Sequence, residues 1–372
     1  GGIDSSLIVS MMQENSINPI KTFTIGFEDK EFDESPFAKS IAKHLQTDHT
    51  EVILDEQDAI DVIPIIPEIY SEPFADSSQI PTFLVSKIAK LNVTVSLSGD
   101  GGDELFGGYN RYFWGKKIWS KISWAPFVVR NLTGKILHSV PSGLYNQMES
   151  VLNTSAKGKG IHSLAGKVKR LSQKLQYIDS TQSLYTSLCT EWNDVNSILD
   201  ESYHNSDNSQ LKFKTTEALS DIENMMQWDL ESYLKEDILT KVDRAAMANS
   251  LETRAPFLDL GVANAAWRMP EAFLVSDFQG KLPLKSLLER YVPRELFERP
   301  KAGFGIPIGQ WLKGPLHEWA SELLAEKALT EEGIFNAAAV SRIWGDHNSG
   351  AADNTVKLWN ILMFRSWMQN GG

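Results

Sequence analysis

The chain has 372 residues, which is enough for roughly two domains or for one large domain with a substantial insertion. Its 36 basic residues against 48 acidic ones leave a formal net charge of −12, which disfavours a polyanion such as RNA as the main partner. No apolar run approaches the roughly 20 residues needed to cross a bilayer, and the single cysteine, Cys189, excludes an internal disulfide framework. We therefore expect a cytoplasmic protein in which Cys189 is a buried, inert thiol.

The chain opens on GGIDSS, two glycines followed by an acid and two hydroxyls. Apolar side chains at helical spacing continue to residue 13, so we expect a glycine turn that leads into a helix with a serine cap. The N–H groups and dipole of a helix N-terminus favour a bound anion. In nucleotide-binding α/β units such a turn follows a buried strand, so we expect that a strand, and with it an upstream domain, precedes Gly1 in the complete protein.

Strands and helices alternate in the N-terminal part of the chain. We expect strands at 21–27, 50–54 and 93–98 and helices at 35–46 (again with a serine cap) and 80–90. Residues 56–70 are expected to be helical apart from their two prolines. This alternation predicts an α/β fold, with a parallel sheet flanked by helices, over residues 1–110. Residues 111–372 have helical periodicity and are expected to be mainly helical. Three tryptophans at the start of this region are expected to pack in its core: Trp114, Trp119 and Trp124.

A second informative stretch, SLSGDGGDELFGGYNRY, follows the strand expected at 93–98. Its glycine-rich loop carries Asp100 and an acidic pair, Asp103 and Glu104. Loops at the carboxyl ends of neighbouring parallel strands converge, so Asp4, Asp100 and Asp103 are expected to lie together. Carboxylate oxygens of this kind, with substrate phosphates, suit Mg²⁺. Taken alone, the stretch GDGGDE is also compatible with an acidic surface turn. The presence of the GGIDSS loop in the same chain favours a ligand site instead.

These stretches resemble a known family. GGIDSS resembles the pyrophosphate-binding SGGxDS loop of the PP-loop ATP pyrophosphatases, lacking only its leading serine, and LSGDGGDELFGGY resembles the signature of the asparagine synthetase family. TFTIGF, HTEVIL, EPFADSSQIPTFLVSK, KVDRAAMANSLETRAPFLD and RPKAGFGIPIGQWL extend the resemblance over nearly the whole chain. It implies a synthetase domain with a PP-loop, Rossmann-like fold. It also implies an N-terminal glutaminase domain, absent from this chain, whose nucleophile is its first cysteine.

The resemblance implies an ATP-dependent amide-forming ligase that uses ATP and Mg²⁺. Such an enzyme adenylates the aspartate side-chain carboxylate with release of pyrophosphate, and ammonia then displaces AMP to give asparagine. Positions that match the family's ATP- and pyrophosphate-binding residues are Gly1, Gly2, Asp4, Ser5, Ser6, Ile25, Ser98 and Gly99. Asp4 and Asp103 match the family's metal-binding acids.

Four further positions match family residues with less defined roles. Lys301 in RPKAGFGIP matches a lysine that faces the adenylate and the departing pyrophosphate. Asp100 stands where many members have a glutamate tied to forming the adenylate or to accepting an ammonia proton, and its shorter reach leaves its role open. Asp243 and Arg254, in KVDR and LETRAP, either orient substrate or form ion pairs.

Several alternatives stay open. The same chemistry on another carboxylate, such as a sugar acid of a surface polysaccharide or a β-amino acid closed into a β-lactam, fits the GDGGDE variant. A PP-loop tRNA-modifying protein is disfavoured by the acidic composition. A degenerate, non-enzymatic scaffold is disfavoured because it would need none of Asp4, Asp103 and Lys301. The partners expected are ATP, aspartate or another carboxylate, and ammonia from glutamine, with no nucleic acid and no membrane; a homodimer is left open.

Overall fold

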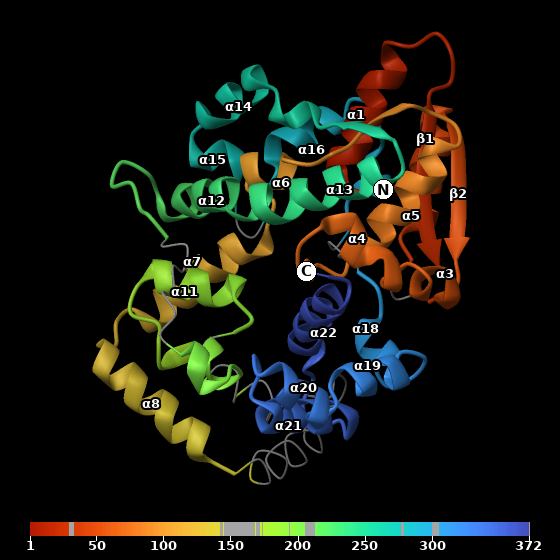
Figure 1. The fold of residues 1–372 in the computed structure, drawn as a ribbon. Coiled ribbons are helices and arrows are strands. Elements are labelled where there is room, and N and C mark those ends of the chain that lie inside the picture. The colour runs from red at the N-terminus through yellow and green to blue at the C-terminus, as the bar shows by residue number, and fades with distance from the viewer. Residues whose placement is uncertain are drawn as a thin grey trace. The chain divides into compact units, whose positions relative to one another are not determined.

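The computed structural model describes residues 1–29, 33–141, 144, 168, 172, 174–192, 194–204, 213–276, 279–299 and 305–371 (Figure 1). Contacts divide the chain into two units. The first is made of Gly1–Tyr109, Asn196–Leu211 and Met226–Gly372, and the second of Asn110–Val195 and Lys212–Met225. None of the helices in the described part is long and apolar enough to span a membrane.

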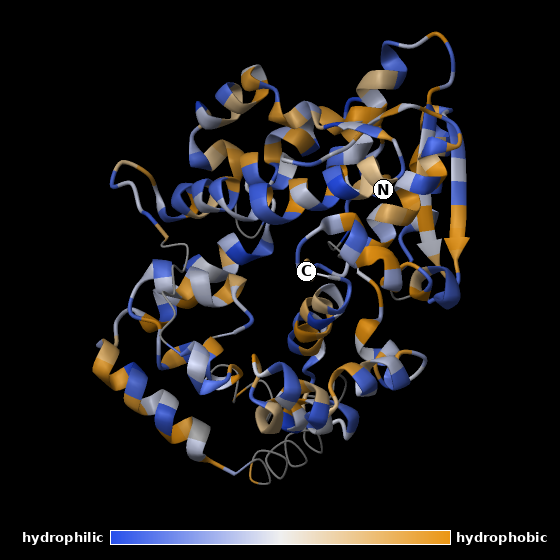
Figure 2. Cartoon of the chain, viewed as in Figure 1, coloured by the Kyte–Doolittle hydropathy of each residue, from blue (hydrophilic) through white to orange (hydrophobic). Residues whose placement is uncertain are grey.

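Two short parallel sheets lie in the first unit. β1 (Lys21–Phe27) pairs with β2 (Asp48–Leu54), and β3 (Val95–Leu97) pairs with β4 (Glu252–Arg254), which comes from a distant part of the sequence. The middle of β2 is hydrophilic and its carboxyl end is hydrophobic (Figure 2). The α/β class with parallel pairing is therefore confirmed, within a structure that is mostly helical.

The other elements of the first unit are helices. In chain order they are α1 (Ile3–Glu14), α2 (Ser35–Leu45), α3 (Glu56–Ile60), η1 (Ile63–Ile65), α4 (Ile66–Tyr70), α5 (Gln79–Lys90), α6 (Gly102–Leu105), η3 (Glu201–Tyr203), the π-helix η4 (Leu234–Leu239), α13 (Thr240–Ala248), η5 (Pro256–Leu258), α14 (Leu260–Trp267), α15 (Glu271–Leu274), α16 (Leu282–Leu288), α17 (Arg294–Phe297), α18 (Ile308–Trp311), α19 (His317–Leu323), α20 (Glu326–Glu332), α21 (Ala337–Asn348) and α22 (Thr355–Gln369). Two elements, η2 (Val195–Ser197) and α12 (Asp221–Glu231), cross the boundary between the units.

The stretch 56–70 is helical apart from the breaks at its two prolines, as expected: it is divided into α3, η1 and α4, because Pro64 and Pro67 lack the N–H that an inner helical position must donate. The serine caps expected for α1 and α2 are absent, so that expectation is wrong. Their N-cap residues are Gly2 and Glu34, and neither makes a side-chain cap.

The second unit contains α7 (Asn110–Ile122), α8 (Phe127–Ser139) and α11 (Thr181–Cys189). Tyr112 and Tyr185 are fully buried there, with ring centroids 6.1 Å apart. The core prediction is wrong for Trp114 and Trp124, whose exposed fractions are 52% and 82%. Trp114 follows the buried Tyr112 and Phe113 and so points to another side of α7.

Cys189 and Trp119 are two further residues of the second unit that were expected to be buried. Cys189 is the last residue of α11 and is exposed, so the prediction of a buried thiol is wrong. Trp119 is half-buried, and the Arg130 guanidinium lies 5.0 Å from its ring centroid.

Candidate functional site

The first acidic residue of the site, Asp4, lies in the first turn of α1. Gly2 is the N-cap in extended conformation and provides no side-chain oxygen, so the first-turn N–H groups of α1 have no side-chain cap. This is the arrangement that the GGIDSS stretch predicts apart from its serine cap: a glycine entry, a helix N-terminus and a carboxylate within one turn.

The second acidic residue, Asp103, lies in α6, directly after Gly101 and Gly102. Gly101 is the N-cap of α6 and has a φ of 89°, a left-handed conformation that side chains other than glycine's rarely adopt. At Gly102 a Cβ atom would lie 2.5 Å from Oδ1 of Asp4, so even an alanine would collide with this carboxylate. The two loops therefore pack directly on one another, as expected for loops at neighbouring strand ends.

Asp4 and Asp103 converge on one ammonium group, that of Lys281. Its Nζ lies 2.5 Å from Asp4 Oδ2 and 2.8 Å from Asp103 Oδ1, and its side chain is 7% exposed. Burial by itself lowers the pKa of Lys281, but the negative charges of Asp4 and Asp103 outweigh it and raise that pKa above its usual value. Lys281 is therefore a cationic partner for two half-buried carboxylates.

The backbone holds Lys281 in this position from both sides. Its N–H donates to the Phe106 carbonyl at 2.9 Å, and its φ of 58° is in the left-handed region. A non-glycine residue in that region carries strain of roughly 1–3 kcal/mol, which tends to be kept at functional sites. The preceding Gly280 packs so closely on Gly107 that a Cβ atom there would collide with the Gly107 carbonyl.

A second charged cluster, made of Asp76, Asp237 and Lys241, lies on η4, α13 and the chain before α5. The buried Lys241 ammonium is 2.5 Å from Asp76 and 3.7 Å from Asp237. Burial raises the pKa of Asp76, but the Lys241 charge outweighs it and the net pKa is lowered. Burial and the Asp76 charge raise the pKa of Asp237. One ammonium thus serves two carboxylates, and the second of them tends to keep its proton.

Asp100 is under the influence of both clusters. Burial raises its pKa, the Ser98 hydroxyl and the Lys241 charge partly offset this, and the Asp103 charge adds to the rise. A carboxylate with a raised pKa is a stronger base than an exposed aspartate.

Glu104, next to Asp103, is buried and binds a tyrosine. It is 1% exposed and accepts a hydrogen bond of 2.6 Å from the Tyr109 hydroxyl. Burial raises the pKa of Glu104 to about 7, although the Tyr109 hydrogen bond acts in the opposite direction. The Tyr109 ring packs edge-on against Tyr233, with ring centroids 5.8 Å apart.

The structure brings many of the residues predicted from the sequence together and leaves others apart. Gly99 packs on α1, because a Cβ there would lie 2.8 Å from Asp4 Cβ and 3.0 Å from the Ser5 nitrogen. Ser98 donates its N–H to the Arg254 carbonyl at 2.9 Å. Ile25 is 4% exposed and lies on β1. The remaining predicted residues of this loop, Gly1, Gly2 and Ser6, lie at or in the first turns of α1.

Three predicted residues are not seen with the acidic loops. Lys301 lies outside the described residues. Asp243 is exposed on α13. The Arg254 side chain is 69% exposed and pairs with Glu252, which matches the ion-pair alternative for this residue. Its backbone, not its guanidinium, contacts the loop after β3.

The sequence reasoning missed Lys281, Asp76 and Asp237. Lys281 and Asp237 stand outside the stretches that carry the resemblance, and Lys281 is 277 positions from Asp4. Asp76 lies within EPFADSSQIPTFLVSK, and that stretch is the signal that could have found it. For Asp237 the local signal is its position four residues before Lys241, a spacing that favours an ion pair on a helix.

Asp4 and Asp103 fit a magnesium ion in the way that nucleotide enzymes hold it. Mg²⁺ typically takes one or two carboxylates and completes its shell with phosphates and water. The two carboxylates already share one cation, the Lys281 ammonium, so their oxygens are directed at a common point. Among the described residues no three His, Cys, Asp or Glu side chains gather into a metal site of their own.

Comparison with known proteins identifies the family. The family model described as asparagine synthase matches residues 1–369. The chain belongs to the asparagine synthase family. It is 33% identical over 374 residues to asparagine synthetase [glutamine-hydrolyzing] 1 of Bacillus subtilis (strain 168), covering 99% of this chain and 54% of that protein.

Two further relatives match the chain over different lengths. A putative asparagine synthetase [glutamine-hydrolyzing] of Mycobacterium bovis is 30% identical over 368 residues, covering 99% of this chain and 53% of that protein. A putative asparagine synthetase [glutamine-hydrolyzing] 2 of Methanocaldococcus jannaschii is 44% identical over 119 residues, which is 32% of this chain and 23% of that protein. The chain spans about half the length of the first two relatives.

Proposed function

We propose that this chain is the synthetase domain of an asparagine synthetase: it uses ATP to adenylate the side-chain carboxylate of aspartate with release of pyrophosphate, and ammonia then displaces AMP. The observation that carries the proposal is the pair Asp4 and Asp103, brought from two glycine-rich loops to one buried cation in a chain of the asparagine synthase family. The names of the relatives support aspartate as the acceptor and glutamine as the nitrogen source of the whole protein.

Each group of residues has a role in this chemistry. The N-terminus of α1 and the GGIDSS residues bind the β- and γ-phosphates, as a helix N-terminus favours anions. Asp4 and Asp103 would hold Mg²⁺, which when bound supplies positive charge to the phosphate oxygens. Lys281 positions both carboxylates. Ile25, Ser98 and Gly99 bind the nucleoside, as the resemblance implies.

The reacting end of the substrate is assigned to three further residues. Asp100, whose pKa is raised, is proposed to accept a proton from the attacking ammonia. Lys301 is proposed to stabilise charge on the adenylate and the departing pyrophosphate. Asp243 and Arg254 remain candidates for orienting substrate, although the ion pair of Arg254 with Glu252 favours a structural part for it.

The fold and setting of the domain complete the proposal. We infer a PP-loop, Rossmann-like core over residues 1–110, a mainly helical region over residues 111–372, and a glutaminase domain on the amino side of Gly1. The share of each relative that this chain covers supports the extra domain. A cytoplasmic location is part of the same proposal.

The test is pyrophosphate release from ATP by the purified chain, compared across aspartate, glutamate, a sugar acid and a β-amino acid, with ammonium as nitrogen source. We expect release that depends on aspartate and asparagine as the product. Release with another acid and not with aspartate contradicts the proposed acceptor. Glutamine should not replace ammonium, because the single cysteine, Cys189, lies at the carboxyl end of α11 and not at a chain start.

A further inference from the structure

The helix α8 faces the rest of the second unit with its polar side. Arg130, which is 7% exposed, donates from its guanidinium to the backbone carbonyls of Ile122 at 3.2 Å and Asp179 at 3.4 Å. One turn further along, a Cβ at Gly134 would lie 2.7 Å from the backbone oxygen of Ser172, so the helix passes close to another part of the chain. Polar groups and a close backbone approach therefore hold this side of α8 in place.

The opposite side of α8 is apolar and exposed. Val128, Leu132 and Ile136 follow one another at four-residue spacing and are 75%, 57% and 59% exposed, and Val129 beside them is 51% exposed. At about 100° per residue these four side chains occupy an arc of about 100°, on the side away from Arg130. Hydrophobic positions recur along the whole length of α8 (Figure 2). A surface helix ordinarily turns its apolar stripe toward the core, so α8 has the reverse arrangement.

The turn before α8 extends this apolar surface. Trp124, between α7 and α8, is 82% exposed, and Phe127, the first residue of α8, is 41% exposed. Exposed large apolar side chains gathered in one place mark a contact with a partner or with a membrane. We call the whole set the α8 surface: Trp124, Phe127, Val128, Val129, Leu132 and Ile136.

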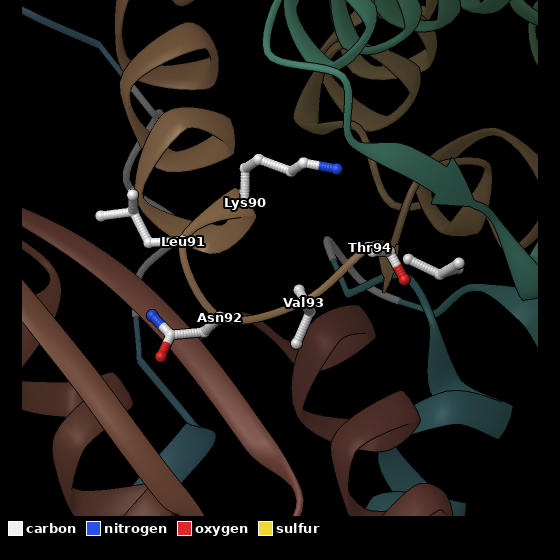
Figure 3. Close-up of a pocket in the computed structure, with 6 residues that line it drawn as sticks. Lys90, Leu91, Asn92, Val93 and Thr94 are labelled. Carbon is white, nitrogen blue, oxygen red and sulfur yellow. The ribbon is translucent and has the colours of Figure 1, made fainter.

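A pocket in the first unit has a different character. It has a volume of about 570 Å³ and is lined by residues 90–95, where apolar side chains lie among those of Lys90, Asn92 and Thr94 (Figure 3). The Lys90 ammonium, the one charged group among the six lining residues, donates to the Ser250 carbonyl at 2.6 Å. This pocket therefore gives no indication of the charge or class of a ligand, whereas the α8 surface does.

The charge around the α8 surface is positive. Residues 110–139, which include α7, the turn and α8, contain six lysines and arginines and no aspartate or glutamate, in a chain whose net charge is −12. Lys116, Lys121 and Lys135 are exposed among them. Lysines around exposed tryptophan and aliphatic side chains are typical of helices that bind anionic lipid, because the lysines attract the headgroups and the apolar side chains enter the boundary with the acyl chains.

The same charge disfavours a second copy of this chain as the occupant. A symmetric dimer would place the α8 surface of one copy against that of the other. The lysines of one copy would then face the same lysines of its partner, and like charges brought together across an interface are unfavourable. An anionic lipid surface carries the opposite charge and is apolar beneath its headgroups, so it complements both properties of the α8 surface.

We propose that the α8 surface binds an anionic lipid membrane, with α8 in the membrane plane and its apolar stripe in the boundary between headgroups and acyl chains. The helix has 13 residues and is about 20 Å long, so it lies on the membrane rather than across it. The proposal goes beyond the proposed function and does not depend on it. It replaces the expectation that no membrane is a partner.

The test is flotation of the chain with vesicles made of equal parts of phosphatidylcholine and phosphatidylglycerol, compared with vesicles of phosphatidylcholine alone. We expect binding to the mixed vesicles, weaker binding to the neutral ones, and a loss of binding at high salt, which screens the lysines. Lys121→Gln and Lys135→Gln should each weaken binding to the mixed vesicles by about fivefold and change binding to the neutral ones little.

The apolar stripe is tested by a triple variant, Val128→Gln with Leu132→Gln and Ile136→Gln. We expect it to reduce binding to the mixed vesicles by at least about tenfold, because it leaves little apolar side chain to enter the boundary. The matched control replaces three exposed apolar residues of the first unit and should bind like the unchanged chain: Ile17→Gln, Leu260→Gln and Phe273→Gln.

A fluorescent label provides a second measurement that does not depend on the triple variant. Because Cys189 is the single cysteine, Cys189→Ser combined with Leu132→Cys allows an environment-sensitive dye to be attached at position 132 alone. Its emission should shift to the blue on mixed vesicles. The same dye at Leu260→Cys, on α14, should show no shift.

Three results would overturn the proposal. The first is equal binding of the unchanged chain to the two kinds of vesicle, or to neither. The second is equal binding by the two triple variants, or a dye shift at position 260 and none at position 132. The third is self-association of the chain without vesicles that the α8 triple variant abolishes, which assigns the surface to a second copy. Flotation requires neither ATP nor aspartate, so none of these results bears on the proposed function.

Discussion

Lys281 donates from a buried ammonium to the Asp4 carboxylate at 2.5 Å, across 277 positions of sequence. The same ammonium lies 2.8 Å from Asp103, so the two acids share one positive charge. Two half-buried carboxylates side by side are stabilised by a cation beside them. Lys281 supplies that charge from within the chain.

Replacing Lys281 with methionine keeps most of the aliphatic stem and removes the charge. We expect the free energy of unfolding without Mg²⁺ to fall by about 3–5 kcal/mol, the usual loss when one partner of a buried ion pair is removed. Added Mg²⁺ should recover part of it, because the freed carboxylates can bind the ion. Urea unfolding with and without Mg²⁺ measures both effects, and Lys285→Met, one helical turn on, is the matched control. If the free energy of unfolding of the Lys281→Met chain is the same with and without Mg²⁺, the assignment of Asp4 and Asp103 as metal ligands is wrong.

The two acids should act as one unit in catalysis. Asp4→Asn and Asp103→Asn are each expected to abolish pyrophosphate release, and the double variant to be no worse than either single one, because each disables the same site. The rates of the four chains at saturating Mg²⁺ form the measurement. Turnover like that of the unchanged chain in either single variant removes that residue from the metal site.

Glu104 should make stability depend on pH. Its pKa rises from 4.5 in the unfolded chain to about 7 in the folded one, so unfolding releases its proton increasingly as pH rises through this window. The folded state should therefore lose about 3 kcal/mol between pH 4.5 and 7 through this group. Glu104→Gln should lack that loss while still accepting from Tyr109.

Urea unfolding at a series of pH values measures the difference between Glu104→Gln and the unchanged chain, which separates Glu104 from other titrating groups. Glu322→Gln, at an exposed position of α19, is the control and should leave the slope alone. Equal slopes for Glu104→Gln and the unchanged chain would show that Glu104 is not protonated in the folded state.

Lys301 offers a test of the family resemblance. If its ammonium stabilises the charge on the leaving pyrophosphate, Lys301→Ala should lower the maximal rate by roughly 10²–10³ while ATP affinity changes little. Lys301→Arg should not restore the rate, because a planar guanidinium presents its charge differently from an ammonium. Pyrophosphate release and ATP affinity, measured separately, decide the matter. A rate within a few-fold of the unchanged chain makes Lys301 an ordinary surface lysine.

The elements that sequence analysis predicted well are those with strong local patterns. β1, β2, α2 and α5 appear close to the expected ranges, because their apolar periodicity agrees with the packing around them. The stretch 56–70 is helical with breaks at its two prolines, because proline is the residue whose effect on a helix is most local. The prediction for Trp114 and Trp124, which are exposed, is wrong because the type of a residue does not show whether another part of the fold packs against it.

For the site, the sequence predicted that Asp4 lies close to the loop at Ser98–Asp103, but it gave no indication of Lys281. The loops carry motifs, and the rule that ligand loops lie at the carboxyl ends of parallel strands brings them together. Lys281 reaches the site through a left-handed turn after Gly280 and a hydrogen bond to Phe106, which are tertiary features. The roles of the predicted site residues, and the division at residue 110, stay predictions.

In the π-helical turn η4, the packing depends more on the number of residues in the turn than on which apolar residues they are. A π turn holds one residue more than an α-helical turn, so the loss of any one residue from Leu234–Leu239 would allow an ordinary α-helix to form. A deletion at Leu234, Lys235 or Glu236 rotates the residues before it by about 100° relative to α13 and leaves the spacing of Asp237 and Lys241 unchanged. Tyr233 would then leave the side of the helix on which its ring packs against Tyr109. Homologous chains can therefore vary the apolar residues of this turn, but a gap at its start separates Tyr233 from Tyr109.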